Sequence, residues 1–219
     1  DYQAGAEPYT GNVLGFGDLW GVAQSNVARL FKDSNKVIEI PATLPEMEKL
    51  DDISGADFTT AQIFTIVANH RNMLSSGDTA SFYFLWLDGY YRDADGVQKG
   101  VLGASFGDSG VIAMFKPVIA DSSSGTPGLN IEKYAEQATI VHEFGHAAGL
   151  VNNGIALASA HEDASHLGHC SNKDCILYWA IDGTAGTVQF VQKSMLASDT
   201  ILYGPECLDD AAKATASAP

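Results

Sequence analysis

The apolar residues of this chain recur with helical spacing in two long segments. In "DFTTAQIFTIVANHRNML" they stand three and four residues apart, which predicts a helix from about residue 57 with one buried face and Asp57 as a cap. The segment "IEKYAEQATIVHEFGHAAGL" (131–150) has the same spacing. Asn130 is available to cap this second helix, and Gly149 can end it by adopting the left-handed conformation.

Other apolar segments have the length of strands. "TASFYFLWLDGYY" (79–91) is apolar on both faces up to the turn signal Asp88-Gly89, which is typical of a strand in the middle of a sheet. "KVIEIPATL" predicts a short strand from Val37 to Ile40. "KGVLGASF" and "VIAMFKPVI", joined by "GDSG", predict a further strand or hairpin, and "PECLDDAAKA" predicts a last short helix.

Composition and charge narrow the class of protein. With 46% hydrophobic and 18% charged residues in a chain of 219, we expect one compact globular unit with frayed ends before about residue 12 and after Lys213. The formal charge of -15 would repel a phosphate backbone, so nucleic acid is not an expected partner.

The sequence also bears on location. No apolar run reaches the roughly 18 residues that span a bilayer. The chain opens "DYQ" rather than with a signal peptide, so we expect that an export signal or an upstream lipid anchor was removed or left out. The acidic balance and low lysine count fit an extracytoplasmic protein, secreted or attached to the outside of a membrane.

The second predicted helix carries the pattern His-Glu-x-x-His. His142 and His146 stand four residues apart, so their imidazoles project from one helix face about 6 Å apart at Cβ and can grip one metal ion. Glu143 can reach a water on that ion and take its proton as general base. A purely structural zinc site would instead need four protein ligands.

A catalytic site of this kind requires a third ligand. Asparagine, which occupies position 152, is a poor zinc ligand. Three histidines follow in "AHEDASHLGHC", and the same segment has two carboxylates; the candidates are His161, His166, His169, Glu162 and Asp163. We expect His70, alone on the earlier helix, to be an ordinary packed or capping residue.

The segment "HEFGHAAGLVN" resembles the signature of metzincin zinc proteases, His-Glu-x-x-His-x-x-Gly-x-x-His/Asp. It matches at His142, Glu143, His146 and Gly149 and departs at Asn152. The later "HCSNKDCIL" resembles archaemetzincins, in which the third zinc histidine precedes Cys-x4-Cys-x-Met. The chain looks most like a group of bacterial exported or membrane-attached metalloproteases with an insert before His-Cys.

This resemblance implies His169 as the third ligand, with His166 as the next choice, and Leu177 in place of the methionine beneath the metal. It also makes Tyr178 a candidate hydrogen-bond donor to the oxyanion, with packing as the alternative. The insert, from about Val151 to Gly168, costs little closure entropy. Leu177 preserves an apolar floor of similar volume.

The three cysteines leave two alternatives open. Archaemetzincins close a second zinc site with Cys-x-x-Cys, but Gly204 stands in place of the first cysteine here. Cys170, Cys175 and Cys207 can therefore form one disulfide with a spare thiol, which we expect in an oxidising compartment, or a three-cysteine metal site completed by a histidine.

The resemblance implies a metzincin-like fold of the α/β or α+β class over residues 1–219. We expect an N-terminal lobe (about 12–150) with a mixed, mostly parallel twisted sheet, a backing helix and the active-site helix. A smaller irregular C-terminal lobe (about 151–213) would end in a helix.

The implied function is that of a zinc-dependent endopeptidase, whose substrate is a protein or peptide. The edge strand that pairs with substrate would lie within "KGVLGASFGDSGVIAMF". The alternative is a zinc-stabilised binding or adhesion module that has lost turnover. A second metal is compatible with the sequence, whereas substrate preference, oligomeric state and control by a propeptide cannot be read from it.

Overall fold

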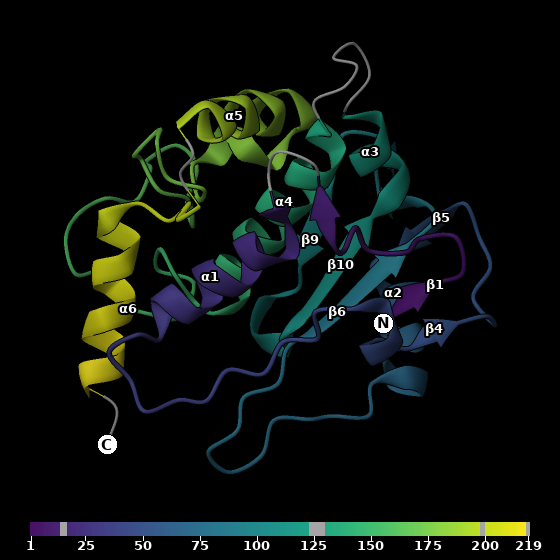
Figure 1. Ribbon diagram of the computed structural model, residues 1–219, viewed down its shortest axis with the longest axis horizontal. Helices are drawn as coiled ribbons and strands as arrows, with labels where there is room; N and C mark the ends of the chain where they lie inside the picture. Colours follow the sequence, from purple (N-terminus) through teal and green to yellow (C-terminus); the bar gives the residue numbers. More distant parts are fainter. Residues whose placement is uncertain (14–16, 123–129, 198–199, 218–219) are drawn as a thin grey trace.

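The protein is a mixed α/β structure built on a mostly parallel five-stranded sheet (Figure 1). The computed structural model describes residues 1–13, 17–122, 130–197 and 200–217. The strand order is β4-β1-β6-β10-β9, and only the edge strand β9 is antiparallel to its neighbour. These strands are β1 (Tyr2–Gln3), β4 (Lys49–Leu50), β6 (Tyr83–Leu87), β9 (Gly103–Ser105) and β10 (Val111–Phe115).

Two smaller sheets lie outside this layer. One pairs β2 (Asn12–Val13) with β3 (Gly17–Asp18), and the other has the order β5-β7-β8. The strands of the latter are β5 (Asp57–Thr59), β7 (Tyr90–Asp93) and β8 (Gly96–Gln98).

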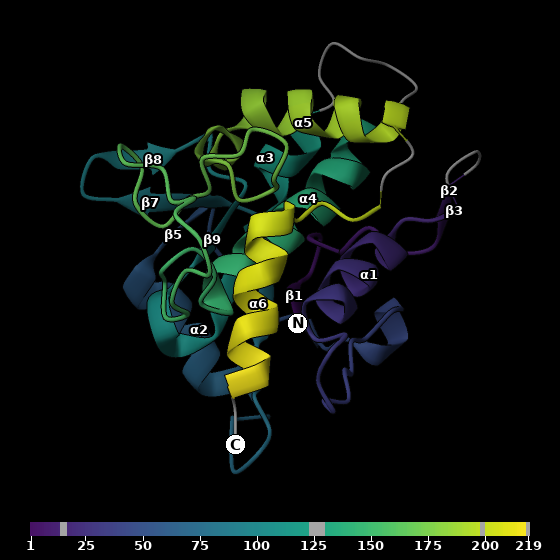
Figure 2. The same ribbon diagram turned by 90° about the vertical axis from the view of Figure 1, so that its left-hand side faces the viewer.

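Helices cover both faces of the main sheet. The helices in the described part of the chain are α1 (Trp20–Leu30), α2 (Thr60–His70), α3 (Lys116–Asp121), α4 (Ile131–Ala147), α5 (Thr184–Ala197) and α6 (Pro205–Ser217). Short 3-10 turns occur at η1 (Leu44–Glu46), η2 (Gly107–Ser109) and η3 (Trp179–Asp182). Figures 1 and 2 show α1 and α2 on opposite faces of the sheet, with α4 on the same side as α1 and α6 alongside the loops that follow α4.

The core is built on β6 and β10, which pair in parallel from Tyr83↔Val111 to Leu87↔Phe115. Every residue of β10 is buried, and so are Tyr83, Leu85, Trp86 and Leu87 of β6. A continuous apolar run is typical of a strand covered on both faces. The prediction of a central strand in segment 79–91 is therefore confirmed.

Helix α4 passes through the middle of the protein and is buried on nearly all sides. A charged pair lies within this buried surface: Lys116 Nζ contacts Glu136 Oε2 at 2.5 Å, and the Tyr9 backbone N–H donates to Glu136 Oε1 at 2.6 Å. The Lys116 ammonium also lies 3.3 Å from the Tyr9 ring centroid. These contacts satisfy the buried carboxylate and fix the N-terminal segment to α4.

Four local predictions are wrong. Segment 37–40 is not a strand, and Val37 is 85% exposed; the edge position belongs to β4 instead. The segment expected to be frayed contains β1, which lies between β4 and β6. Asp57 belongs to β5, and its carboxylate binds Arg92 at 2.5 and 3.0 Å. The residue that caps α2 is Thr59, whose side chain accepts from the Gln62 N–H. Asn130 precedes α4 with a φ of 50° but makes no side-chain cap.

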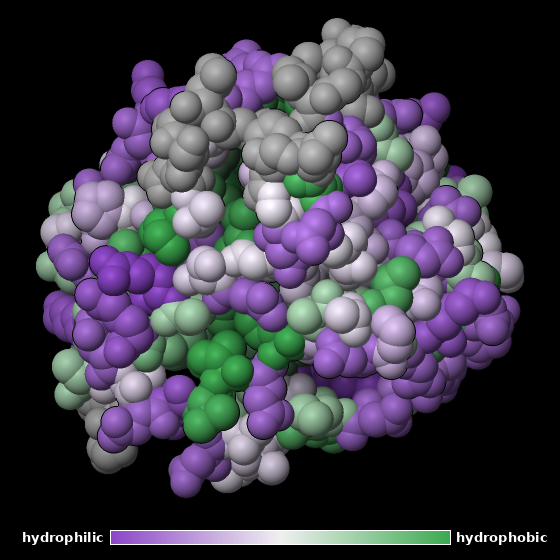
Figure 3. Space-filling model, viewed as in Figure 1, coloured by the Kyte–Doolittle hydropathy of each residue, from purple (hydrophilic) through white to green (hydrophobic). Residues whose placement is uncertain are grey.

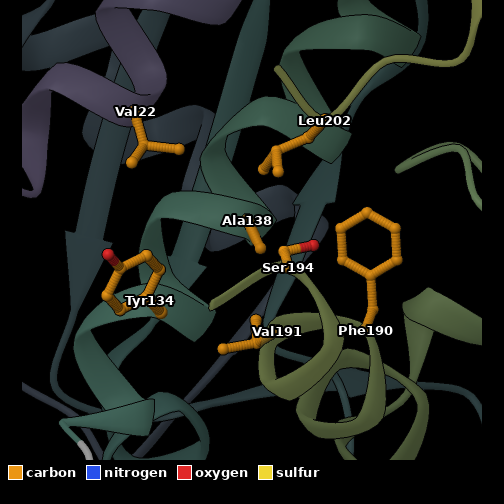
Figure 4. Close-up of a pocket in the computed structure, with 7 residues that line it drawn as sticks. All are labelled: Val22, Tyr134, Ala138, Phe190, Val191, Ser194 and Leu202. Atoms are coloured by element: carbon orange, nitrogen blue, oxygen red, sulfur yellow. The ribbon is translucent and has the colours of Figure 1, made fainter. Parts of the chain in front are cut away.

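A small apolar cavity of about 10 Å³, roughly one water in size, lies where α1, α4 and α5 meet (Figure 4); it is lined by Val22, Tyr134, Ala138, Phe190, Val191, Ser194 and Leu202. Hydrophilic residues cover much of the face in Figure 3, with apolar patches near its centre.

No helix in the described part of the chain is long and apolar enough to cross a membrane. The expected division into lobes at about residue 150 stays a prediction.

Candidate metal centre

Helix α4 places the imidazoles of His142 and His146 on one face. The Nε2 atoms of His142 and His146 lie 3.0 Å apart, as the four-residue spacing predicts. His142 Nδ1 donates to the carbonyl oxygen of Ile176 at 2.7 Å. A carbonyl oxygen only accepts, so Nδ1 carries a proton and Nε2 is the nitrogen that faces the other members of the cluster and would bind a metal.

His169 and Asp182 bring the donors to four. The Asp182 carboxylate lies 2.7 Å from His142 Nε2 and 3.0 Å from His169 Nε2. The ligand atoms of His142, His146, His169 and Asp182 all lie within 4.8 Å of one another. Three imidazoles and a carboxylate are a donor set that suits zinc and other divalent transition metals, so this cluster is a candidate metal site.

The electrostatics of the cluster follow from burial and from Asp182. Burial alone would lower the pKa of His142, but the Asp182 hydrogen bond and the Glu143 charge outweigh it, so the pKa is raised. Burial and the two neighbouring imidazoles lower the pKa of His146 well below its usual value. Burial would raise the pKa of Asp182, yet hydrogen bonds from His142 and His169 hold it far lower.

The other sequence candidates for this site lie outside the cluster. His166 contacts Asp163 at 3.1 Å through Nδ1, and its ring stacks on Trp179 with centroids 4.0 Å apart. The ring centroids of Tyr178 and Trp179 lie 5.6 Å apart, and Tyr178 is not among the residues that line the cleft. Its role as oxyanion donor stays a prediction. Asn152 contacts Glu162 at 3.4 Å.

Glu143 lies at the base of a cleft of about 400 Å³. The edge strand and its flanks, α4, the loop beyond α4 and η3 all contribute to its lining. The other lining residues are Val101, Gly103, Ala104, Ser105, Gly107, His146, Asn153, Leu167, Gly168, His169 and Asp182. Burial raises the pKa of Glu143, the His142 charge and hydrogen bonds from Ser105 lower it, Asp182 raises it, and the net shift is upward. A raised pKa suits a proton acceptor working near neutral pH.

Strand β9 crosses very close to this carboxylate. A Cβ added at Gly103 would lie 2.7 Å from Thr139 Cγ2 and 3.0 Å from Glu143 Cγ. Only glycine allows the strand to approach α4 so closely.

The helix also rests on an apolar floor. A Cβ at Gly145 would lie 2.9 Å from Leu177 Cδ2 and 3.1 Å from Tyr203 Cε1. Gly145 therefore lets the buried Leu177 pack directly against the turn that carries both histidines. This is the position at which the sequence predicted an apolar floor.

The chain turns sharply where α4 ends. Gly149 has a φ of 89°, as expected, and Val151 and Asn152 follow with φ of 52° and 63°. For a β-branched residue this conformation is strained by roughly 1–3 kcal/mol. The strained turn directs the chain away from the compact motif and into the inserted loop.

Asn153 joins the helix end to the third histidine. Its Nδ2 contacts the carbonyl oxygens of Leu150 at 2.8 Å and Gly168 at 3.1 Å, and lies 3.2 Å from His146 Nδ1. One amide thus fixes the residue before His169 relative to α4. Sequence reasoning missed Asn153, whose only signal is its place directly after the motif.

Replacing Asn153 by alanine should weaken metal binding at the cluster by about 10–100-fold, the usual effect of removing an outer-shell partner. Competition with a chelating dye measures the affinity. Asn152→Gly is the matched control, because glycine keeps the positive φ and only the weak contact with Glu162 is lost. Equal affinities in the two variants would contradict a positioning role for Asn153.

The cysteines form a second cluster instead of the expected disulfide. Cys170, Cys175 and Cys207 are free and buried, and Cys175 Sγ lies 3.5 Å from Cys207 Sγ. The ligand atoms of His161, Cys170 and Cys207 lie within 4.8 Å of one another, so the described part of the chain has two candidate metal sites.

Asp182 was also missed by sequence reasoning. It lies in η3, in a segment without clear periodicity, and no local pattern separates it from the other acidic residues. No family model, curated protein or solved structure matches this chain significantly. The function must therefore be argued from the site itself.

Proposed function

We propose that the protein is a zinc-dependent endopeptidase. The observation that carries the proposal is Glu143, a buried carboxylate with a raised pKa, at the base of an open cleft beside three converging imidazoles. The resemblance of the His142–Gly149 segment to metzincins supports the same reading. A zinc ion bound by His142, His146 and His169 would acidify a bound water and polarise a peptide carbonyl.

The protein's own groups would move the protons. Glu143 would take a proton from the attacking water on a carboxylate oxygen and pass it to the leaving amine. Hydrogen bonds from Ser105 hold this carboxylate at the sheet edge. His142 Nδ1 stays hydrogen-bonded to Ile176, so the tautomer that directs Nε2 into the cluster is kept throughout.

Strand β9 would bind the substrate main chain. Leu102 O accepts from Phe115 N and Phe106 N donates to Val111 O, so these groups of the strand face β10. In an antiparallel ladder the intervening groups, those of Gly103 and Ser105, point away from β10. The Ser105 N–H already donates to Glu143, so the main-chain groups of Gly103 and the Ser105 carbonyl would pair with substrate. An extended peptide can pair there through main-chain hydrogen bonds, with its scissile bond beside Glu143.

Removing the metal should abolish hydrolysis. We expect the protein dialysed against a strong chelator to lose cleavage of an unfolded protein substrate, and added zinc to restore it, with at least one zinc per chain by elemental analysis. An anomalous-scattering map at the zinc edge identifies the ligands. Unchanged hydrolysis by metal-free protein would overturn the proposal.

Asp182 favours a second candidate, the zinc-stabilised binding module. Its carboxylate already contacts two of the three imidazoles, and a fourth protein ligand is typical of closed structural sites. The Asp182 side chain is 53% exposed, however, so it can withdraw toward solvent. Full zinc occupancy without hydrolysis at any pH would favour the binding module. The extracytoplasmic location stays a prediction.

A further inference from the structure

We propose that His161, Cys170, Cys175 and Cys207 form a second, closed zinc site that fastens the inserted loop and thereby sets the position of His169. This site does not depend on the peptidase activity, because none of its ligands lines the cleft. The argument rests on four buried side chains, on the groups that orient them, and on the connection from Cys170 to the first cluster.

The four donors are buried together. All three cysteines are fully buried, and His161 is only 4% exposed. His161 Nδ1 lies 3.4 Å from Cys170 Sγ, Cys175 Sγ lies 3.5 Å from Cys207 Sγ, and Cys170 hydrogen-bonds with both other thiols. Three thiolates and one imidazole are a common tetrahedral ligand set for structural zinc, and the set leaves no position for water.

The imidazole is oriented as metal-bound histidines are. His161 Nε2 lies 2.9 Å from Asp210 Oδ2, and Asp210 is fully buried on α6. The carboxylate keeps the proton on Nε2 and leaves Nδ1 free to face the sulfurs. This carboxylate–histidine pairing is the usual outer shell of a zinc site.

Backbone donors complete the outer shell on the sulfur side. The N–H groups of Gly204 and Leu177 donate to Cys175 Sγ at 3.1 and 3.4 Å. Such hydrogen bonds stabilise a thiolate over a thiol. A Cβ at Gly204 would lie 2.9 Å from Cys175 Cβ, so the close approach requires glycine.

The same groups hold the inserted loop. Asp210 Oδ1 accepts from the Ala158 N–H at 2.6 Å, so one carboxylate ties both the loop and its histidine to α6. Within the loop, the Ser171 N–H donates to His161 O and the Asp163 N–H donates to His169 O, both at 2.7 Å. A metal on His161 would therefore anchor the loop at its middle.

Two consecutive residues link the two clusters. His169 belongs to the first cluster and Cys170 to the second. The Cys170 N–H also donates to Leu177 O at 2.7 Å, which ties this residue to the floor beneath α4. Zinc on Cys170 should hold His169 in place and raise metal affinity at the first cluster by roughly tenfold, within the usual range of coupling between sites.

The test measures the binding of Co²⁺, which replaces zinc and gives an absorption band when thiolates bind it. A His142→Ala/His146→Ala variant removes two ligands of the first cluster, so we expect it to bind one Co²⁺ per chain with an intense thiolate-to-cobalt charge-transfer band. Adding His161→Ala should weaken this binding by about 100-fold. Adding His161→Cys in place of His161→Ala should restore cobalt binding, because cysteine supplies a fourth metal ligand. Cysteine cannot make the hydrogen bond to Asp210, so restored binding would show that position 161 acts as a ligand.

The control variant is His166→Ala, which removes a half-exposed loop histidine and should leave the band and the affinity unchanged. Coupling is measured in the otherwise intact chain, where His161→Ala should lower affinity at the first cluster. Absence of the charge-transfer band, a Cys175–Cys207 disulfide in the purified protein, or failure of His161→Cys to restore binding would each overturn the second site. None of these results depends on hydrolysis, so the peptidase proposal stands or fails separately.

Discussion

Glu143→Gln is expected to lower the rate of peptide hydrolysis by about 10²–10⁴-fold while zinc stays bound. Glutamine keeps the volume of the side chain but cannot accept the proton of the attacking water. The carboxylate is buried at the base of the cleft and its pKa is raised, so the change removes a base suited to neutral pH. Initial rates on an unfolded protein substrate measure the loss.

Glu132→Gln is the matched control for this experiment. Glu132 lies in the first turn of the same helix, so the substitution makes the same change in charge far from the cluster. It should leave the rate unchanged and cost at most about 1 kcal/mol of stability. A Glu143→Gln protein that cleaves as fast as the wild type would rule out the general base.

The second large effect is expected at the third ligand. His169→Ala should weaken zinc binding at the first cluster by about 100-fold or more, since even the loss of an outer-shell partner costs 10–100-fold. His166→Ala should leave the affinity unchanged, because His166 binds Asp163 and stacks on Trp179. Isothermal titration of the metal-depleted variants measures both affinities.

These two variants separate the alternatives that the sequence left open. Both histidines lie in the inserted loop, and both substitutions remove the same group. A large loss on His166→Ala with none on His169→Ala would show that the loop adopts another path when metal is bound. Equal small losses would mean that Asp182 and the helix histidines suffice.

The helix and the face that carries His142 and His146 could be predicted because their positions depend on local sequence. The four-residue step between His142 and His146 fixes their relative position, whatever the rest of the chain does. The apolar run of β6 likewise predicts a central strand. Strands β1 and β4 have two residues each, which is too short for a hydrophobic pattern, and their pairing depends on contacts distant in sequence.

The rest of the site could not be predicted because it depends on the path of a loop. His161, His166 and His169 have similar sequence contexts, and only the folded chain divides them between two clusters and the surface. Asp182 comes near His142 through the turn at η3, and Asn153 through the strained turn after α4. Hydrogen bonds between distant residues decide these positions.

The closeness of Gly103 to α4 bears on the substrate preference that the proposed peptidase would have. With no room for even a methyl group between the strand and Glu143, β9 has no side chain at position 103 that could contact a substrate. Preference for particular substrate side chains would instead come from the inserted loop, where Leu167 lines the cleft and is 74% exposed. If the proposed function is correct, changes in that loop would alter substrate preference and leave the histidine-bearing face of α4 unchanged.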